Sequence, residues 1–167
     1  FTGDGYRLIG LDHFALEGDE LSRAQAAGTM FRNFQGYTVR PAEDTIAFGV
    51  SSIADIGGAY GQNPHKLKDW VDAVEAGRIP VERGASMTDD DVLRRFVINR
   101  VMCQLRLDLG EVQAQFGKAS RDAIEADLRA GLDELVADGL VTFDGAVLTV
   151  KPLGQLLVRN VAMLFDA

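Results

Sequence analysis

The chain has 167 residues, and its 47% hydrophobic and 25% charged content is that of an ordinary globular protein with one medium domain or two small ones. Its formal net charge of −8 opposes binding to phosphate backbones and anionic membrane surfaces, so we expect neither a nucleic-acid nor a membrane partner. The sequence shows no apolar run long enough to span a bilayer and no signal-peptide pattern, which predicts a cytoplasmic protein.

The single cysteine, Cys103, excludes an internal disulfide and a thiolate cluster for zinc or an iron–sulfur centre. Its place beside the apolar stripe of a predicted helix favours a buried, unreactive thiol. The sequence begins with Phe1 rather than Met, and we interpret it as a piece of a longer protein.

Residues 1–62 are rich in glycine and in segments with strand character. The apolar run at residues 6–16, YRLIGLDHFAL, predicts a buried strand that ends near Asp12 and His13 and opens onto a site. A short helix is expected at residues 19–28, with a capping aspartate before it and a glycine stop after it.

Residues 29–38, TMFRNFQGYT, place aromatic residues at every third position with polar residues between them; the aromatics are Phe31, Phe34 and Tyr37. Such rings can form a wall that stacks on a planar ligand while the intervening amides bind its polar edge. In the alternative interpretation, the rings close the end of the core and Arg32 lies in a nearby salt bridge. Residues 45–63 are rich in small side chains, which let a backbone approach a ligand or another strand.

Residues 63–167 predict a series of helices. Asn63-Pro64 signals the start of the first helix, and Thr88, followed by the acids of residues 89–91, signals the start of the second. We assign those acids to capping rather than to a metal site. A short helix is expected near residues 110–116, and a longer one begins at Ser120. The apolar faces predicted for the first, second and fourth helices comprise Leu67, Trp70, Val71 and Val74, then Leu93, Val97, Val101 and Leu105, then Ile124, Leu128, Leu132, Leu135 and Val136.

A β-hairpin is predicted over residues 140–150, with Asp144-Gly145 as its turn, and Pro152 opens a last helix. The inward-facing residues expected on that helix are Leu153, Leu156, Leu157, Val161 and Leu164. This order resembles a winged-helix module, which often binds DNA. The helix before the hairpin opposes that function because its acids outnumber Arg121 and Arg129. We therefore interpret the module as a packing element or lid on a larger body.

Five segments, in this order, resemble the C-terminal part of the oxygen-independent coproporphyrinogen III oxidase family, which are radical S-adenosylmethionine enzymes of haem (porphyrin) biosynthesis. The segments are GLDHFA (10–15), RNFQGYT (32–38), GVSSI (49–53), RGASMTDDDVLRR (83–95) and GQLLVRN (154–160). The resemblance implies an α+β, mostly helical fold. It makes residues 1–62 the C-terminal portion of the radical SAM catalytic domain, a partial parallel (β/α) barrel. Residues 63–167 become a helical, winged-helix-like cover domain with one β-hairpin.

The resemblance implies an oxidoreductase in which a [4Fe-4S] cluster, held by three cysteines, cleaves S-adenosyl-L-methionine to a 5'-deoxyadenosyl radical. That radical abstracts hydrogen from propionates of coproporphyrinogen III, and loss of carbon dioxide leaves two vinyl groups and gives protoporphyrinogen IX. Because Cys103 is the only thiol, this chain cannot bind the cluster. We expect it to be an inactive fragment whose partner is the N-terminal radical SAM domain of the same polypeptide.

By the same resemblance, Gln35 and Ile53 match positions that contact S-adenosylmethionine, including a second molecule beside the first. Gly49 and Ser51 would let the backbone approach that cofactor. Arg32 is a candidate for binding substrate carboxylates, since arginine pairs well with planar anions. Tyr37, the last aromatic of the same segment, is a second candidate for substrate binding.

Asp12 and His13 are candidates for a catalytic pair. His13 can donate a hydrogen bond to a substrate propionate or return a proton, and Asp12 can fix its tautomer. The alternative is a structural pair that ties the strand to a loop. Two other functions also stay open, namely a free-standing binding module without catalysis and a haem-binding relative of the family of the haem-chaperone type.

Overall fold

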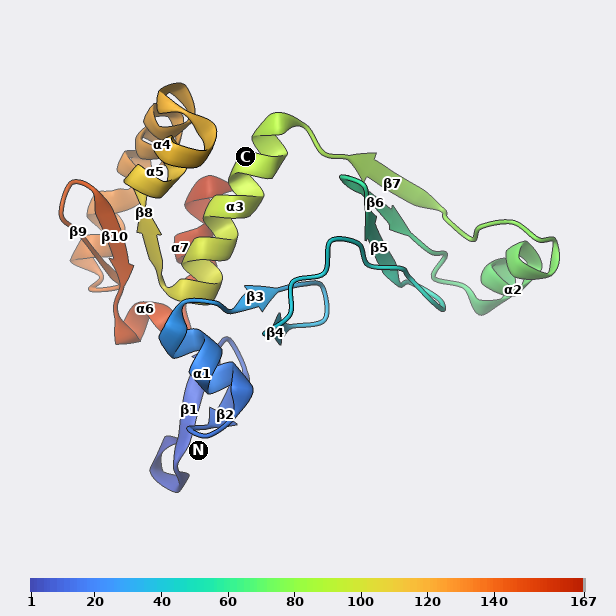
Figure 1. Ribbon diagram of the computed structural model, residues 1–167, viewed down its shortest axis with the longest axis horizontal. Coiled ribbons are helices and arrows are strands. Elements are labelled where there is room, and N and C mark those ends of the chain that lie inside the picture. The colour runs from blue at the N-terminus through green and yellow to red at the C-terminus, as the bar shows by residue number, and fades with distance from the viewer. Residues whose placement is uncertain (167) are drawn as a thin grey trace. The chain divides into compact units, whose positions relative to one another are not determined.

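The computed structural model describes residues 1–166, and the chain divides into two compact units (Figure 1). Unit 1 comprises Phe1–Arg40 together with the chain from Leu93 onward, and unit 2 comprises Pro41–Val92. The boundary predicted between residues 62 and 63 lies inside unit 2. That boundary concerns the domains of a longer polypeptide, and it stays a prediction.

Unit 1 begins with a 3-10 turn at Thr2–Asp4 and an antiparallel hairpin of β1 (Tyr6–Gly10) and β2 (His13–Leu16). The single buried strand predicted over residues 6–16 is therefore wrong. The chain reverses at Leu11, which adopts the left-handed backbone conformation with φ +51°. Most residues of the two strands are half-buried or exposed.

A helix and a second, shorter hairpin follow. α1 (Glu20–Ala27) is capped by the Asp19 carboxylate, which accepts a hydrogen bond from the backbone N–H of Leu21 at 2.8 Å, and Gly28 ends the helix at φ +66°. The predicted capping aspartate and glycine stop of this helix are confirmed. β3 (Phe31–Arg32) then pairs antiparallel with β4 (Tyr37–Thr38).

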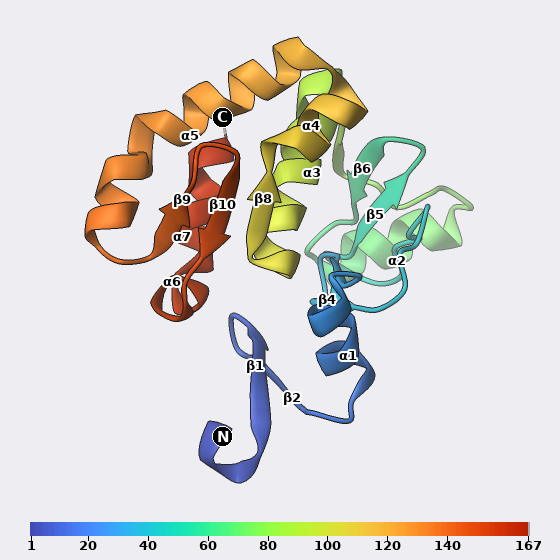
Figure 2. The ribbon, with the colours of Figure 1, turned by 60° about the vertical axis from the view of Figure 1, so that its left-hand side comes forward.

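The rest of unit 1 packs helices on a three-stranded antiparallel sheet in the order β8-β10-β9 (Figure 2). Its elements, in chain order, are α3 (Asp89–Gln104, whose first turn lies in unit 2), β8 (Arg106–Asp108), α4 (Leu109–Phe116), α5 (Lys118–Ala137), β9 (Val141–Phe143), β10 (Val147–Val150), α6 (Pro152–Leu156), α7 (Val158–Ala162) and a 3-10 turn (Met163–Phe165). The predicted helices and hairpin are confirmed, with α5 starting two residues before Ser120. No sequence pattern predicts β8, which is only three residues long.

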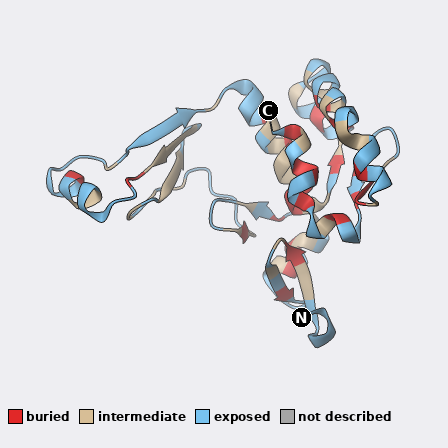
Figure 3. Ribbon diagram, turned by 180° about the vertical axis from the view of Figure 1, so that it is seen from behind, coloured by how far each residue is buried: buried red, intermediate tan, exposed pale blue. Residues whose placement is uncertain are grey.

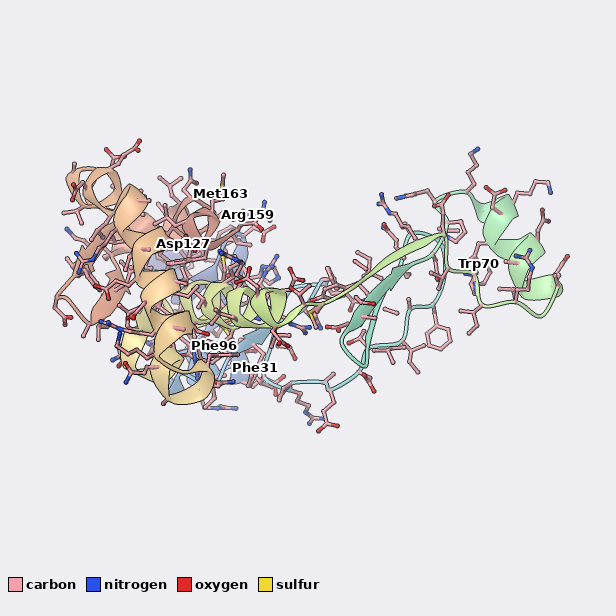
Figure 4. The ribbon with its side chains drawn as sticks, turned by 90° about the horizontal axis from the view of Figure 1, so that it is seen from above. Phe31, Trp70, Phe96, Asp127, Arg159 and Met163 are labelled. Carbon is pink, nitrogen blue, oxygen red and sulfur yellow. The ribbon has the colours of Figure 1, made fainter. Side chains whose placement is uncertain are left out.

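Buried residues gather on α3, α5 and the sheet of unit 1 (Figure 3). Fully buried members of this core include Val101, Val112, Ile124, Leu128, Leu148, Val161 and Phe165. Asp127 of α5 (Figure 4) accepts a 3.0 Å hydrogen bond from Arg94 of α3, and Arg94 also donates to the Phe165 carbonyl. This mostly buried arginine thus ties two helices to the C-terminal turn.

The last predicted helix is broken into α6 and α7, and its orientation differs from the prediction. Leu153, Leu156 and Leu157 are exposed, whereas Val158 and Val161 are buried. The apolar spacing indicated a helix but could not say which of its faces the rest of the chain covers.

Unit 2 consists of an antiparallel sheet and one helix. The sheet has the order β5-β6-β7, formed by β5 (Ile53–Ile56), β6 (Ala59–Gln62) and β7 (Arg83–Ser86), and the helix is α2 (Leu67–Glu75). Ala73 is the only buried residue of α2, and Leu67 and Val74 are exposed. Unit 2 therefore has very little core of its own.

α2 starts three residues after Pro64, where the sequence predicted its start. Asn63 is 2% exposed, and its hydrogen bonds go to the preceding loop. Its backbone N–H donates to the Ser52 carbonyl at 2.9 Å, and its side-chain amide donates to the Gly49 carbonyl at 2.8 Å. Asn63 thus fastens the preceding loop instead of capping the helix.

The expected end of a parallel (β/α) barrel is not seen, because every strand pair within residues 1–166 is antiparallel and the strands close no barrel. That the segment from α3 through β10 forms a winged-helix-like module stays a prediction. The α+β character, a mixture of helices and small sheets, is confirmed.

We predict that Gly154→Ala destabilises unit 1 by roughly 1–3 kcal/mol, the usual cost of overpacking a core. A methyl group at this buried position of α6 would collide with the Leu140 carbonyl oxygen and would lie 3.0 Å from Val150 Cγ1. Chemical denaturation measures the effect. The control is Gly18→Ala, at an exposed position with open space around it, which should change stability by less than about 0.5 kcal/mol. Equal effects of the two substitutions would contradict the prediction.

Candidate functional site

The turn of the β1–β2 hairpin presents Asp12 and His13. His13 Nδ1 lies 2.9 Å from Asp12 Oδ1, and the side chain of Asp12 is 89% exposed. The imidazole also makes an edge-to-face contact with the Tyr37 ring, with centroids 5.2 Å apart. The sequence predicted the pairing of Asp12 with His13, and the contact with Tyr37 connects this pair to the second hairpin.

The turn of the β3–β4 hairpin is built around Asn33. Its carboxamide oxygen accepts hydrogen bonds from the backbone N–H groups of Gln35, at 2.9 Å, and Gly36, at 3.2 Å. The Asn33 backbone N–H donates to the Gly36 carbonyl at 3.0 Å. The turn is therefore closed from within, and the exposed Gln35 side chain stands at its tip.

Tyr37 holds this hairpin on the core of unit 1. Its side chain is buried, and its hydroxyl donates to the Met102 carbonyl of α3 at 3.3 Å. Gly10 of β1 lies directly against the Tyr37 ring, where any Cβ would collide with the phenol. The β1–β2 hairpin, the β3–β4 hairpin and α3 therefore meet around the Tyr37 ring.

The three aromatics of residues 29–38 do not form one wall. Tyr37 pairs across the hairpin with Arg32, and Phe31 pairs with Thr38. Because neighbouring strand residues point to opposite faces, Phe31 lies on the face opposite Tyr37. Phe31 is 42% exposed and Phe34 is 55% exposed. The three aromatics are therefore one core residue, Tyr37, and two outward-facing rings, Phe31 and Phe34. Phe31 is labelled in Figure 4.

Arg32 is a partly buried cation beside Tyr37. Its Nε atom is buried and has no hydrogen-bond partner, and we find no ion pair for it within the described chain. The salt bridge considered in the alternative interpretation of this segment is therefore not observed. A guanidinium in this state favours an anionic group supplied from outside residues 1–166.

The other predicted cofactor residues lie in unit 2. Gly49 has φ +87° and Ser51 has φ +55°, a conformation that non-glycine residues rarely adopt. Their loop is fastened by the Ser51 N–H, which donates to the Pro64 carbonyl at 2.9 Å, and by the side-chain amide of Asn63. Ile53 is half-buried at the start of β5. Gln35 belongs to unit 1, whereas these three residues belong to unit 2.

The thiol of Cys103 is 1% exposed, and burial raises its pKa to about 12. The prediction of a buried core cysteine is confirmed. No group of three or more histidine, cysteine or acidic side chains suited to a metal ion occurs among residues 1–166. The donor set of the described chain therefore does not fit a [4Fe-4S] cluster, which needs several accessible thiolates. In the same range, no helix is long and apolar enough to cross a membrane.

Burial raises the pKa of Tyr37 to about 12, with the Cys103 thiol adding to the rise and Arg32 and Arg159 opposing it. A phenol ordinarily has a pKa of about 10, so folding holds the Tyr37 proton more tightly. The stability that follows is fully present below pH about 10 and is lost as the pH rises towards about 12.

We predict that Tyr37→Phe lowers the free energy of unfolding at pH 7 by about 1 kcal/mol, because the hydrogen bond to Met102 is lost. The difference from the wild type narrows between pH about 10 and about 12, since phenylalanine has no proton to lose. Urea unfolding at several pH values measures both effects. A difference that stays constant up to pH 12 would show that Tyr37 does not titrate in this way.

Comparisons with known proteins agree with the motifs. The family model of the HemN C-terminal domain matches residues 87–157. The oxygen-independent coproporphyrinogen III oxidase of Thermostichus vulcanus is 46% identical over 99% of this chain and 51% of its own length. The enzyme of the same name from Pseudomonas aeruginosa is 41% identical over 97% of this chain and 35% of its own length.

One solved structure, described as coproporphyrinogen III oxidase (HemN) from Escherichia coli and as a radical SAM enzyme, matches with a TM-score of 0.92 and 41% identity. The match covers 99% of this chain and 38% of that one. This chain thus spans about a third to a half of the length of these relatives. Residues 87–157 match the HemN C-terminal domain, and 97–99% of the chain is similar to a part of proteins named oxygen-independent coproporphyrinogen III oxidase.

Proposed function

We propose that this chain is part of an oxidoreductase that converts two propionates of coproporphyrinogen III to vinyl groups in anaerobic haem biosynthesis, giving protoporphyrinogen IX. The observation that carries the proposal is the match of 99% of the chain to a HemN structure with a TM-score of 0.92 and 41% identity. The curated relatives from several bacteria bear the same enzyme name.

In this proposal, a larger N-terminal radical SAM domain of the same polypeptide binds the [4Fe-4S] cluster. When bound, the cluster and S-adenosylmethionine supply the radical that starts the oxidation. Residues 1–166 offer no cluster ligands, so the chain on its own is inactive. Its share of the work is to bind and orient, with residues 1–62 completing the catalytic domain and residues 63–167 forming a winged-helix-like cover.

We assign Gln35 to contact with S-adenosylmethionine. The side-chain amide is exposed at the tip of a turn whose backbone is closed by Asn33, so it can donate and accept hydrogen bonds without reorganising the hairpin. Gly49 and Ser51 adopt positive φ in the loop that precedes Ile53, and the lack of a Cβ at Gly49 suits close approach of a ligand.

We assign Arg32 to a substrate carboxylate. It is partly buried, it has no ion-pair partner within the described chain, and its guanidinium can bind a propionate through two hydrogen bonds. Tyr37 contributes indirectly, because its hydroxyl is already bonded to Met102 and its ring is buried. It holds Arg32, its partner across the hairpin, in place.

We predict that the whole native polypeptide converts coproporphyrinogen III to protoporphyrinogen IX anaerobically with S-adenosylmethionine and a reductant, whereas this 167-residue chain alone gives no product above the background. Chromatography of the oxidised porphyrins measures the conversion. Absence of conversion by the whole polypeptide, together with a Soret shift on haem addition, would favour the haem-binding relative. Absence of both would favour the non-catalytic binding module.

We also predict that Gln35→Ala in the whole polypeptide weakens S-adenosylmethionine binding about tenfold, the effect of losing roughly 1.4 kcal/mol of hydrogen bonding. Equilibrium titration measures the affinity. The matched control is Gln113→Ala, another exposed glutamine, placed on α4, which should leave the affinity unchanged. Wild-type affinity in the Gln35→Ala protein would remove Gln35 from the cofactor site.

A further inference from the structure

His13 faces the turn that carries Gln35. A Cβ built on Gly36 would lie 2.7 Å from His13 Nε2, closer than real Cβ atoms approach another atom, and 3.4 Å from Cε1, an ordinary contact distance. The backbone of the turn at Gly36 therefore comes close to the Nε2 edge of the imidazole. The other ring nitrogen, Nδ1, is held by Asp12 at 2.9 Å. Each of the two nitrogens thus faces a part of this chain.

The ring is held from a third side as well. Its edge-to-face contact with Tyr37, at an interplanar angle of 83°, sets the tilt of the imidazole. The residue before the pair, Leu11, sits in the left-handed region at φ +51°, which costs free energy in a bulky side chain and persists only where its surroundings fix it. Asp12 and Tyr37 thus both contact the imidazole and restrict its orientation.

The Asn33 carboxamide oxygen accepts hydrogen bonds from the backbone N–H groups of both Gly36 and Gln35, which couples the positions of these two residues. A displacement of Gly36 is therefore passed to Gln35. Binding groups must be placed to within about 0.5 Å of their productive geometry. A side chain that positions Gly36 therefore also positions the Gln35 amide.

We propose that His13 is a positioning residue whose imidazole supports the 33–36 turn, and that the lack of a side chain at Gly36 lets this contact place the Gln35 amide for S-adenosylmethionine. The inference rests on the proposed function of Gln35. It replaces proton transfer by His13 with a steric role, since Nε2 faces the Gly36 backbone and Nδ1 faces Asp12.

A double-mutant cycle in the whole native polypeptide tests this inference with Gly36→Ala, His13→Ala and the double variant. Gly36→Ala should weaken S-adenosylmethionine binding at least about tenfold, and the same change in the His13→Ala background should weaken it less than about threefold, because the space of the imidazole receives the new methyl group. The positive φ of Gly36, +149°, penalises alanine in both backgrounds and cancels in the cycle. Gly5→Ala, at φ +85° with nothing within 4 Å of its Cβ, is the control for backbone strain and should leave the affinity unchanged.

The same four proteins are unfolded in urea, which reports on the contact without any ligand. Gly36→Ala should shift the unfolding midpoint by a smaller amount when His13 is already alanine. Equal losses of affinity from Gly36→Ala in the two backgrounds would overturn the inference. If the wild type binds no S-adenosylmethionine, the proposed function fails, and so does the cofactor role of the contact; the urea cycle then shows whether the contact itself exists.

Discussion

The candidate site depends on one buried ring, that of Tyr37. Its hydroxyl donates to the Met102 carbonyl of α3, its phenol end lies against Gly10 of β1, and its neighbour across the hairpin is Arg32. The two hairpins of unit 1 are short, and β3 and β4 have only two residues each. Two-stranded pairs of this size are not stable by themselves. Tyr37 couples them to a helix that belongs to the main core, and this gives the exposed turns a fixed base.

This arrangement explains how a polar, exposed tip can bind with precision. Gln35 is exposed, but the turn that carries it is closed by Asn33 and lies against His13. His13 in turn is fixed by Asp12 and Tyr37. The groups assigned to ligands, Gln35 and Arg32, are therefore placed by neighbours that have no need to touch a ligand.

The sequence predicted those features that rest on local chemistry. Asp19 as a helix cap and the Asp144-Gly145 turn both appear where they were expected, because caps and tight turns depend on a few adjacent residues. The pairing of Asp12 with His13 was predictable for the same reason. The resemblance of RNFQGYT and GLDHFA to one enzyme family was confirmed by the comparisons.

The predictions that were wrong or missing concern structural features that depend on residues far apart in the sequence. Leu11 gives no turn signal, so the sequence predicts one strand where the structure has a hairpin. The aromatic spacing could not show that Tyr37 turns inward, because that depends on the register of a hairpin and on α3. The contact of Gly36 with His13 joins residues 23 positions apart, and its only sequence signal was a glycine within a polar turn.

The central claim is that the tip of the β3–β4 hairpin, supported by His13, is a cofactor contact. A crystal structure of the whole native polypeptide with S-adenosylmethionine tests it most directly. We expect density for the cofactor within hydrogen-bonding distance of the Gln35 side chain, with the His13 imidazole still against Gly36. Cofactor density that touches neither Gln35 nor any other residue of the 33–36 turn would contradict the account.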